Sequence, residues 1–178
     1  MPHDSRGVYY AAPSPIRLSL NDFREVDASS DVGAIAANGG ILASDTTPIL
    51  RGDAAETQEI SWAASNSDPI AAQVALPVDF NGADDVGIEL QVNSGTTDPA
   101  TFTVETGWDS GALVSDSATD GAKSATTHKI TGTIAAADIP DNAEYLTIVL
   151  TPGAHTTNAI QLKSVRLTYV PKNFSPQP

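Results

Sequence analysis

The sequence predicts an all-β fold, a two-sheet antiparallel β-sandwich of the jelly-roll type. Apolar residues recur with a period of two through the middle of the chain, and helical periodicity is nearly absent. Clusters of Gly, Pro, Asn and Asp separate seven or eight short apolar runs. A strand that buries one face and exposes the other has this period. Short strands divided by frequent turns are typical of sandwiches.

The first predicted strands are short and far apart, over residues 16–20 and 60–62. Between them, residues 27–57 are rich in Ala, Gly, Asp and Thr. This composition predicts a long loop, with short strand pieces near residues 41–42 and 49–50.

The clearest alternation lies in the centre of the chain. Every even-numbered residue from Ile70 to Phe80 is apolar, and the same pattern returns from Val86 to Val92. Residues 81–85, between the two runs, are Asn, Gly, Ala and Asp, which favour tight turns. These two strands are therefore predicted to pair as a hairpin.

Four more strands are predicted toward the C-terminus, over residues 102–108, 126–134, 146–150 and 160–169. In the last of them the apolar positions are even-numbered through Leu162 and odd-numbered from Val165, which predicts a β-bulge near Lys163 or Ser164. Residues 135–140 are too few for a stable helix and end at a proline, which predicts a single 3₁₀ corner between the sheets.

One domain is expected, because 178 residues is a typical length for a single core. It is predicted over residues 16–170, between an extended N-terminal arm of residues 1–15 and a C-terminal tail of residues 171–178. Both ends carry several prolines and no sustained apolar period.

Charge and composition argue against several partners and chemistries. The formal net charge is −13 at pH 7, so neither nucleic acid nor an anionic membrane surface is expected as a partner. No apolar run approaches the roughly 18 residues of a membrane-spanning helix, and no secretory signal is apparent. The absence of Cys excludes disulfides, thiolate metal sites and cysteine nucleophiles.

No catalytic, cofactor-binding or metal-binding residue is predicted. His3, His128 and His155 are far apart and lack the spacing of zinc ligands. A phosphate-binding loop and a Gly-x-Ser-x-Gly elbow are also absent. Glycosidase chemistry needs two carboxyl groups across a cleft, and an aromatic content of 6% leaves few side chains to line one. The chain is therefore not expected to be an enzyme.

Several motifs have both a functional and a structural interpretation, and the structural one is favoured for each. One turn could offer oxygen ligands to Ca²⁺ or simply stabilise its backbone; its polar residues are Asp79, Asn81, Asp84 and Asp85. Residues 116–121 repeat this pattern more weakly. Residues 51–53 match the Arg-Gly-Asp adhesion triplet, or form an ordinary turn. Trp62 and Trp108 are either a sugar-stacking pair or core anchors.

Five segments carry a resemblance to a known family: residues 60–66 (ISWAASN), 74–77 (VALP), 103–106 (TVET), 134–140 (IAAADIP) and 150–155 (LTPGAH). Through them the stretch from Gly40 to Tyr169 resembles small phage virion proteins encoded near the major capsid protein. The resemblance implies a capsid decoration, or cement, protein on the capsid exterior. Its partner would be the major capsid protein, and such proteins commonly form trimers.

The last predicted strand supports an alternative function. Residues 160–167 are also similar to the last strand of carbohydrate-binding jelly rolls, and Lys163 stands where such modules often carry an Asp. The alternative is a carbohydrate-binding adhesion domain on the virion surface.

A homotrimer is expected if the protein decorates a capsid. Like charges repel over about 8 to 10 Å at ordinary salt, so an acidic chain must associate through uncharged surfaces. The predicted strand face of Ala71, Gln73 and Ala75 is such a surface. The terminal arms, which contain Tyr9-Tyr10 and Phe174, would then reach onto the capsid subunits.

Overall fold

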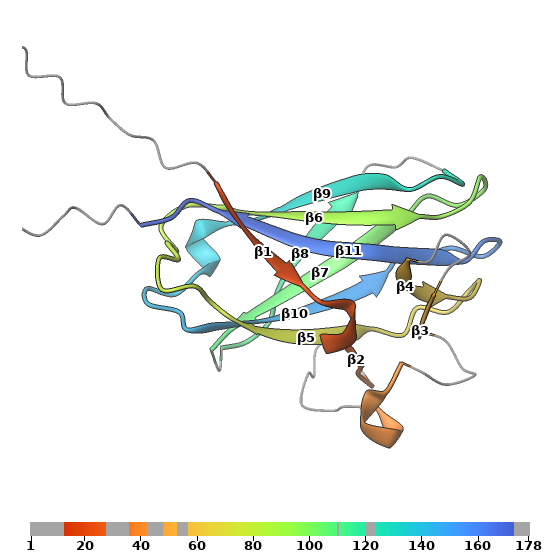
Figure 1. The fold of residues 1–178 in the computed structure, drawn as a ribbon, viewed down its shortest axis with the longest axis horizontal. Coiled ribbons are helices and arrows are strands. Elements are labelled where there is room, and N and C mark those ends of the chain that lie inside the picture. The colour runs from red at the N-terminus through yellow and green to blue at the C-terminus, as the bar shows by residue number, and fades with distance from the viewer. Residues whose placement is uncertain are drawn as a thin grey trace, which may run out of the picture.

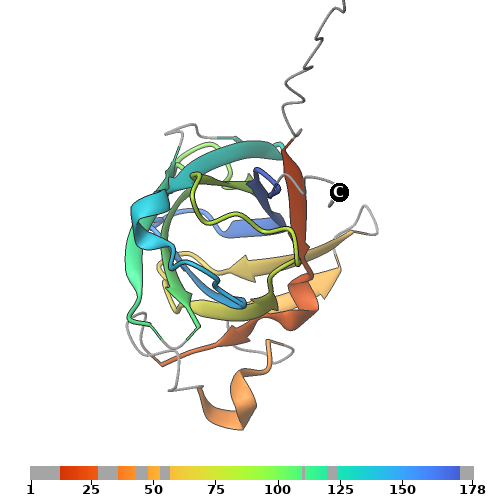
Figure 2. The same cartoon turned by 90° about the vertical axis from the view of Figure 1, so that its left-hand side faces the viewer.

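The computed structural model describes residues 13–27, 36–42, 48–52, 57–109, 111–119 and 124–172. Two antiparallel sheets pack face to face around one core, as Figures 1 and 2 show from two sides. The described residues form strands and three 3₁₀ turns, with no α-helix among them. The predicted all-β, two-sheet sandwich is confirmed. No helix in this part of the chain has the length and apolar character needed to cross a membrane.

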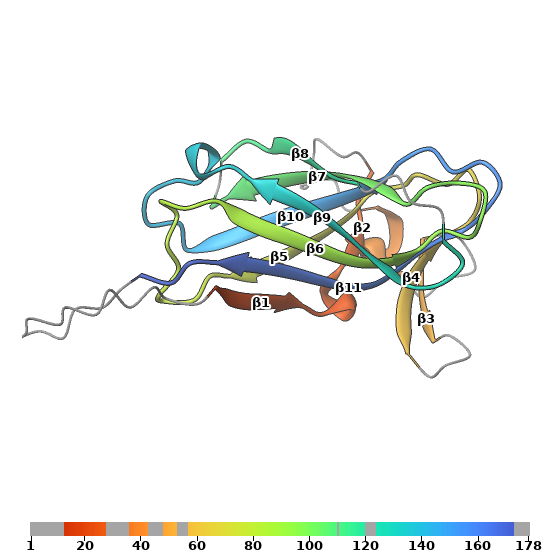
Figure 3. The ribbon, with the colours of Figure 1, turned by 90° about the horizontal axis from the view of Figure 1, so that it is seen from above.

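The first sheet has six strands. Five of them lie in the order β3 (Ile49–Gly52), β4 (Gln58–Trp62), β11 (Ile160–Tyr169), β6 (Val86–Asn93) and β9 (His128–Ile134). The sixth, β1 (Ser14–Leu18), pairs with the second half of β11, on the edge that β4 occupies through Leu162. Figure 3 shows β1 and β4 following one another along β11. The strand β11 therefore exchanges one neighbour for another at its middle.

The second sheet has five strands, in the order β2 (Arg24–Glu25), β5 (Ile70–Ala75), β10 (Tyr145–Pro152), β7 (Thr101–Trp108) and β8 (Val114–Thr119). From β4 onward the chain changes sheet at every connection except the one between β7 and β8. This repeated crossing is the connectivity of a jelly roll.

The predicted hairpin between the strands that begin at Ile70 and Val86 is wrong. The strand β5 pairs with β10 and β2, whereas β6 lies in the other sheet between β11 and β9. Pro77 has no N–H to donate to a ladder, and Phe80 is buried with its ring centroid 5.8 Å from that of Trp108. The segment after β5 therefore closes the end of the core and carries the chain across.

Two irregular features are confirmed. The register between β11 and β6 shifts between Leu162 and Ser164, which is the predicted bulge. The 3₁₀ turn η3 (Ala136–Asp138) forms the corner between β9 in one sheet and β10 in the other. The other two turns are η1 (Leu20–Asp22) and η2 (Ala37–Gly40).

The remaining differences lie in polar sequence. The strand piece near 49–50 exists as β3, but residues 41–42 are not a strand. Strand β8 was not predicted, because residues 114–119 are mostly Ser, Thr and Asp and show no apolar alternation. It pairs with β7 and buries Ala118. This strand is thus identified by its pairing with β7 and not by an alternation of apolar residues in its sequence.

Candidate functional site

Positive charge gathers on the outer face of the six-stranded sheet. The strands of this sheet carry five basic and two acidic residues, although the whole chain has a net charge of −13. The basic residues are Arg17, Arg51, Lys129, Lys163 and Arg166, and the acidic ones are Glu59 and Glu89. They alternate along the strands with buried apolar residues, so the pleat directs them away from the core. We call this surface the basic face.

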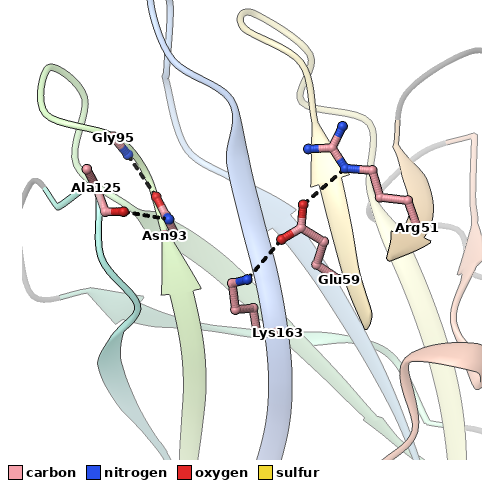
Figure 4. A network of polar contacts seen from close by, with 6 residues as sticks. All are labelled: Arg51, Glu59, Asn93, Gly95, Ala125 and Lys163. Carbon is pink, nitrogen blue, oxygen red and sulfur yellow. Dashed lines mark hydrogen bonds and ion pairs between the residues drawn. The ribbon is translucent and has the colours of Figure 1, made fainter. Parts of the chain in front are cut away.

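The first ion-pair cluster on the basic face spans three strands. Glu59 on β4 accepts from Arg51 Nε at 3.0 Å and lies 3.1 Å from Lys163 Nζ, as Figure 4 shows. The Glu59 side chain is 4% exposed. Its two basic neighbours come from β3 and from the bulge of β11, so the cluster ties three strands together on this face.

The second cluster spans the other side of the same sheet. Glu89 on β6 forms two ion pairs. Its Oε1 lies 2.7 Å from Lys129 Nζ, and its Oε2 pairs with Arg166 Nη2. Both oxygens of this carboxylate are therefore engaged by cations.

Arg17 adds a second arginine beside this cluster. It lies directly opposite Arg166 in the antiparallel ladder of β1 and β11. Among the described residues no carboxylate is within ion-pair distance of Arg17. Like charges directly opposite each other on adjacent strands are unfavourable, so this pair leaves uncompensated positive charge on the sheet surface.

A hollow of about 390 Å³ lies beside these two arginines. Its volume is within the range of about 300 to 1,000 Å³ that is typical of small-molecule sites. It is lined by Arg17, Leu18, Glu89, Gln91, Ser164, Val165 and Arg166. These residues come from β1, β6 and β11, and Ser164 and Gln91 are register partners immediately after the bulge. The bulge and the exchange of β4 for β1 thus shape this part of the face.

The two tryptophans lie in the core, which confirms the structural interpretation. Trp62 and Trp108 are 0% and 3% exposed. Trp62 Nε1 donates to the Asp68 carbonyl at 2.8 Å, and its ring meets Phe102 edge-on at 5.7 Å. Neither indole can stack on a ligand from solution.

His128 and His155 do not line the hollow. His155 is buried, with Nδ1 2.7 Å from the Gly153 carbonyl and Nε2 3.0 Å from the Ala63 carbonyl. His128 begins β9, and His3 lies outside the described residues. His155 thus fastens two loops together.

The Asx-rich turn uses its oxygens internally. Asp79 Oδ1 accepts from the Tyr169 hydroxyl at 2.7 Å, and Asp84 Oδ2 accepts from Asn81 Nδ2 at 2.7 Å. Asp85 Oδ1 accepts from the Ala136 amide at 2.9 Å. The Asn81–Asp84 bond stabilises the turn itself, as the structural interpretation expects, whereas Asp79 and Asp85 fasten the turn to β11 and to the corner at η3.

The other predicted motifs are also dispersed. Asp116 lies on β8, where burial and the charge of Asp138 raise the pKa of its carboxyl, while residues 120–121 lie outside the described residues. Arg51 and Gly52 end β3, and Asp53 is likewise outside them. None of these motifs contributes to the hollow, and sequence reasoning did not predict its lining residues. Two signals lay near it, the predicted bulge and the similarity of residues 160–167 to the last strand of carbohydrate-binding jelly rolls.

Comparisons with known proteins identify the fold. No known protein family matches the sequence, and no curated protein matches it either. The xylan-binding module CBM15 matches with a TM-score of 0.54 at 14% identity, covering 91% of this chain and 100% of that one. Xylanase 10C from Cellvibrio japonicus matches with a TM-score of 0.50 at 14% identity, covering 86% of this chain. This chain covers only 28% of that enzyme.

The fold is therefore the jelly-roll sandwich that carbohydrate-binding modules also have. Neither of these proteins is described as a capsid component, so the resemblance to capsid decoration proteins stays a prediction.

Proposed function

We propose that this chain is a non-catalytic carbohydrate-binding domain that holds a polysaccharide against the basic face. The hollow is the observation that carries this proposal. Gln91 and Ser164 line it, and their side chains make no hydrogen bond to another described residue. Such groups can serve the many hydroxyls of a sugar. The fold shared with a xylan-binding module supports the same function.

The carboxylates of the hollow favour a site that binds a saccharide without hydrolysing it. Glu89 is the only acidic residue among its lining residues, and ion pairs hold both of its oxygens. Glycoside hydrolysis commonly uses two carboxyl groups about 5 to 10 Å apart. The hollow supplies contacts for a ligand without such an acid pair.

A panel of polysaccharides tests this function. Affinity gel electrophoresis and calorimetry would use xylan, β-glucan, galactan, dextran and polygalacturonate. Gln91→Ala is expected to weaken binding about 3- to 10-fold, the worth of one or two hydrogen bonds. Gln73→Ala is the matched control, because Gln73 is an exposed glutamine on the outer face of the opposite sheet. Failure of every polysaccharide to bind, or equal losses in both variants, would contradict the proposal.

Capsid decoration by a homotrimer is the second candidate. The outer face of the five-stranded sheet favours it, because Gln73 and Ala75 are exposed there and Thr147 lies opposite Gln73, with no charge on any of the three. Such a surface allows self-association of an acidic protein without charge repulsion.

Light scattering tests the second candidate. The unmodified chain is expected to be a trimer at micromolar concentration. Dissociation of this trimer by Gln73→Glu, but not by Gln91→Glu, would support association through this face. An N-terminal deletion that tests capsid attachment should stop at residue 12, since Ser14 and Pro15 belong to β1. A monomer, or full capsid binding by the truncated chain, would contradict this candidate.

A further inference from the structure

The charges around the hollow do not balance. Arg17, Arg166 and Glu89 lie side by side across β1, β11 and β6, and Lys129, which is opposite Gln91 on β9, reaches Glu89 diagonally. Glu89 is committed to Lys129 and Arg166, and Arg17 has no carboxylate partner among the described residues. An anion placed beside Arg17 and Arg166 would relieve the repulsion between these neighbours.

The hollow also lacks an aromatic ring. None of its lining residues is aromatic, and the six aromatic residues of the core are nearly inaccessible: Phe23, Trp62, Phe80, Phe102, Trp108 and Tyr169. Stacking on a ring therefore contributes nothing to a ligand held in this hollow. Its affinity must come from hydrogen bonds, and bonds to charged groups are the strongest of these.

The overall negative charge does not prevent an anion from binding here. At physiological salt, charges further apart than about 8 Å are largely screened from each other. The basic face is locally positive, because the strands of its sheet carry five basic and two acidic residues. The distant acidic residues instead disfavour polyanions over the rest of the surface.

From this we infer that the hollow holds an anionic saccharide, a sugar unit that carries a carboxylate or sulfate group, with that group between Arg17 and Arg166. The inference rests on the proposed function, since it names the ligand class of the same site. Gln91 and Ser164 would meet the sugar hydroxyls, whereas the apolar Leu18 and Val165 below the hollow are nearly buried in the core. Polar and charged side chains therefore supply the contacts of this hollow.

Pairs of polymers with the same sugar backbone, one charged and one neutral, test the inference. Calorimetry would compare polygalacturonate with highly methyl-esterified polygalacturonate, and dextran sulfate with dextran. At least one charged polymer is expected to bind at least about tenfold more tightly than its neutral counterpart, and less tightly as salt rises. The pair in which the charged polymer gains more over its own neutral counterpart identifies carboxylate or sulfate as the anionic group.

Two variants of equal charge change locate the binding. Arg17→Gln is expected to lower the affinity for the charged polymer about tenfold or more and to leave the affinity for the neutral polymer unchanged. Lys172→Gln, an exposed lysine outside the hollow, is expected to change neither. Thermal unfolding of both variants checks that they are folded.

Three outcomes would overturn the inference. They are equal affinity for charged and neutral polymers, equal losses in Arg17→Gln and Lys172→Gln, and single-stranded DNA that binds as tightly as the charged saccharide. The first outcome would contradict the inference that the ligand is anionic, but it would leave the proposed carbohydrate binding intact. If no polysaccharide binds at all, the proposed function fails as well.

Discussion

Lys163 Nζ lies 3.1 Å from Oε2 of the buried Glu59, at the bulge where β11 exchanges β4 for β1. This lysine stands where the last strand of carbohydrate-binding jelly rolls often carries an acidic residue. Its contact with Glu59 gives it a structural role in this chain. The nearby residues Ser164 and Arg166 line the hollow in which we propose that a ligand binds.

Removing Glu59 should destabilise the sheet. Glu59→Ala is expected to lower the free energy of unfolding by about 1 to 3 kcal/mol, because Lys163, only 19% exposed, loses this carboxylate. The double variant Glu59→Ala/Lys163→Ala should lose less than the sum of the two single variants. Additive losses in denaturant titrations would show that the two side chains do not interact.

Gly95 should tolerate no side chain. Its φ is +70°, and an added Cβ would lie 2.7 Å from Asn158 Cγ. Gly95→Ala is therefore expected to cost about 2 to 4 kcal/mol of unfolding free energy, from backbone strain and steric overlap together. Gly39→Ala is the matched control, because Gly39 has a φ of +72° but open space around its Cβ position. It should cost only about 1 kcal/mol, and equal losses in thermal unfolding would refute the steric contribution.

Tyr169 should make stability depend on alkaline pH. Burial, followed by the hydrogen bond and charge of Asp79, raises the pKa of the Tyr169 phenol above its ordinary value of 10.0. The folded state therefore retains the proton longer than the unfolded state. This contribution is complete below pH 10 and is lost as the pH rises through the folded-state pKa.

Tyr169→Phe tests this dependence. At pH 7 it should cost about 1 kcal/mol for the lost hydrogen bond to Asp79. The difference in melting temperature from the unmodified chain should narrow above pH 10, since phenylalanine does not titrate. A constant difference from pH 7 to pH 11 would contradict the assignment.

Neutralising Asp116 should stabilise the protein at neutral pH. Burial, with the charge of Asp138, raises the pKa of Asp116 above its ordinary value of 3.8. The folded state thus binds this proton more tightly, and stability is lost as the pH rises through the folded-state pKa. Asp116→Asn is expected to raise the unfolding free energy at pH 7 by up to about 1 kcal/mol, because the group is partly solvated.

The pH profile separates this effect from a general effect of charge. The gain from Asp116→Asn should shrink as the pH falls through the raised pKa of Asp116, because the carboxyl then takes up its proton. The exposed Asp141→Asn removes the same formal charge and should change stability by less than about 0.5 kcal/mol. Equal gains from the two variants would indicate relief of net charge alone.

The apolar period determined most of the fold. The alternation from Val86 to Val92 corresponds to β6, and the phase change after Leu162 corresponds to the bulge in β11. These features depend on burial of alternate side chains, which a sequence records directly. The sequence of strand β8 shows no such alternation of apolar residues. This strand is identified by its backbone pairing with β7.

The sequence by itself therefore determined that the chain is an all-β sandwich with buried tryptophans and a bulged last strand. Only the tertiary structure decided which strands are neighbours, as the incorrect hairpin of Ile70 and Val86 demonstrates. The hollow depends on those neighbours, since Arg17 and Arg166 come from opposite ends of the chain. Local alternation specifies which side chains face the core, but strand order and register arise from non-local packing that brings distant segments together.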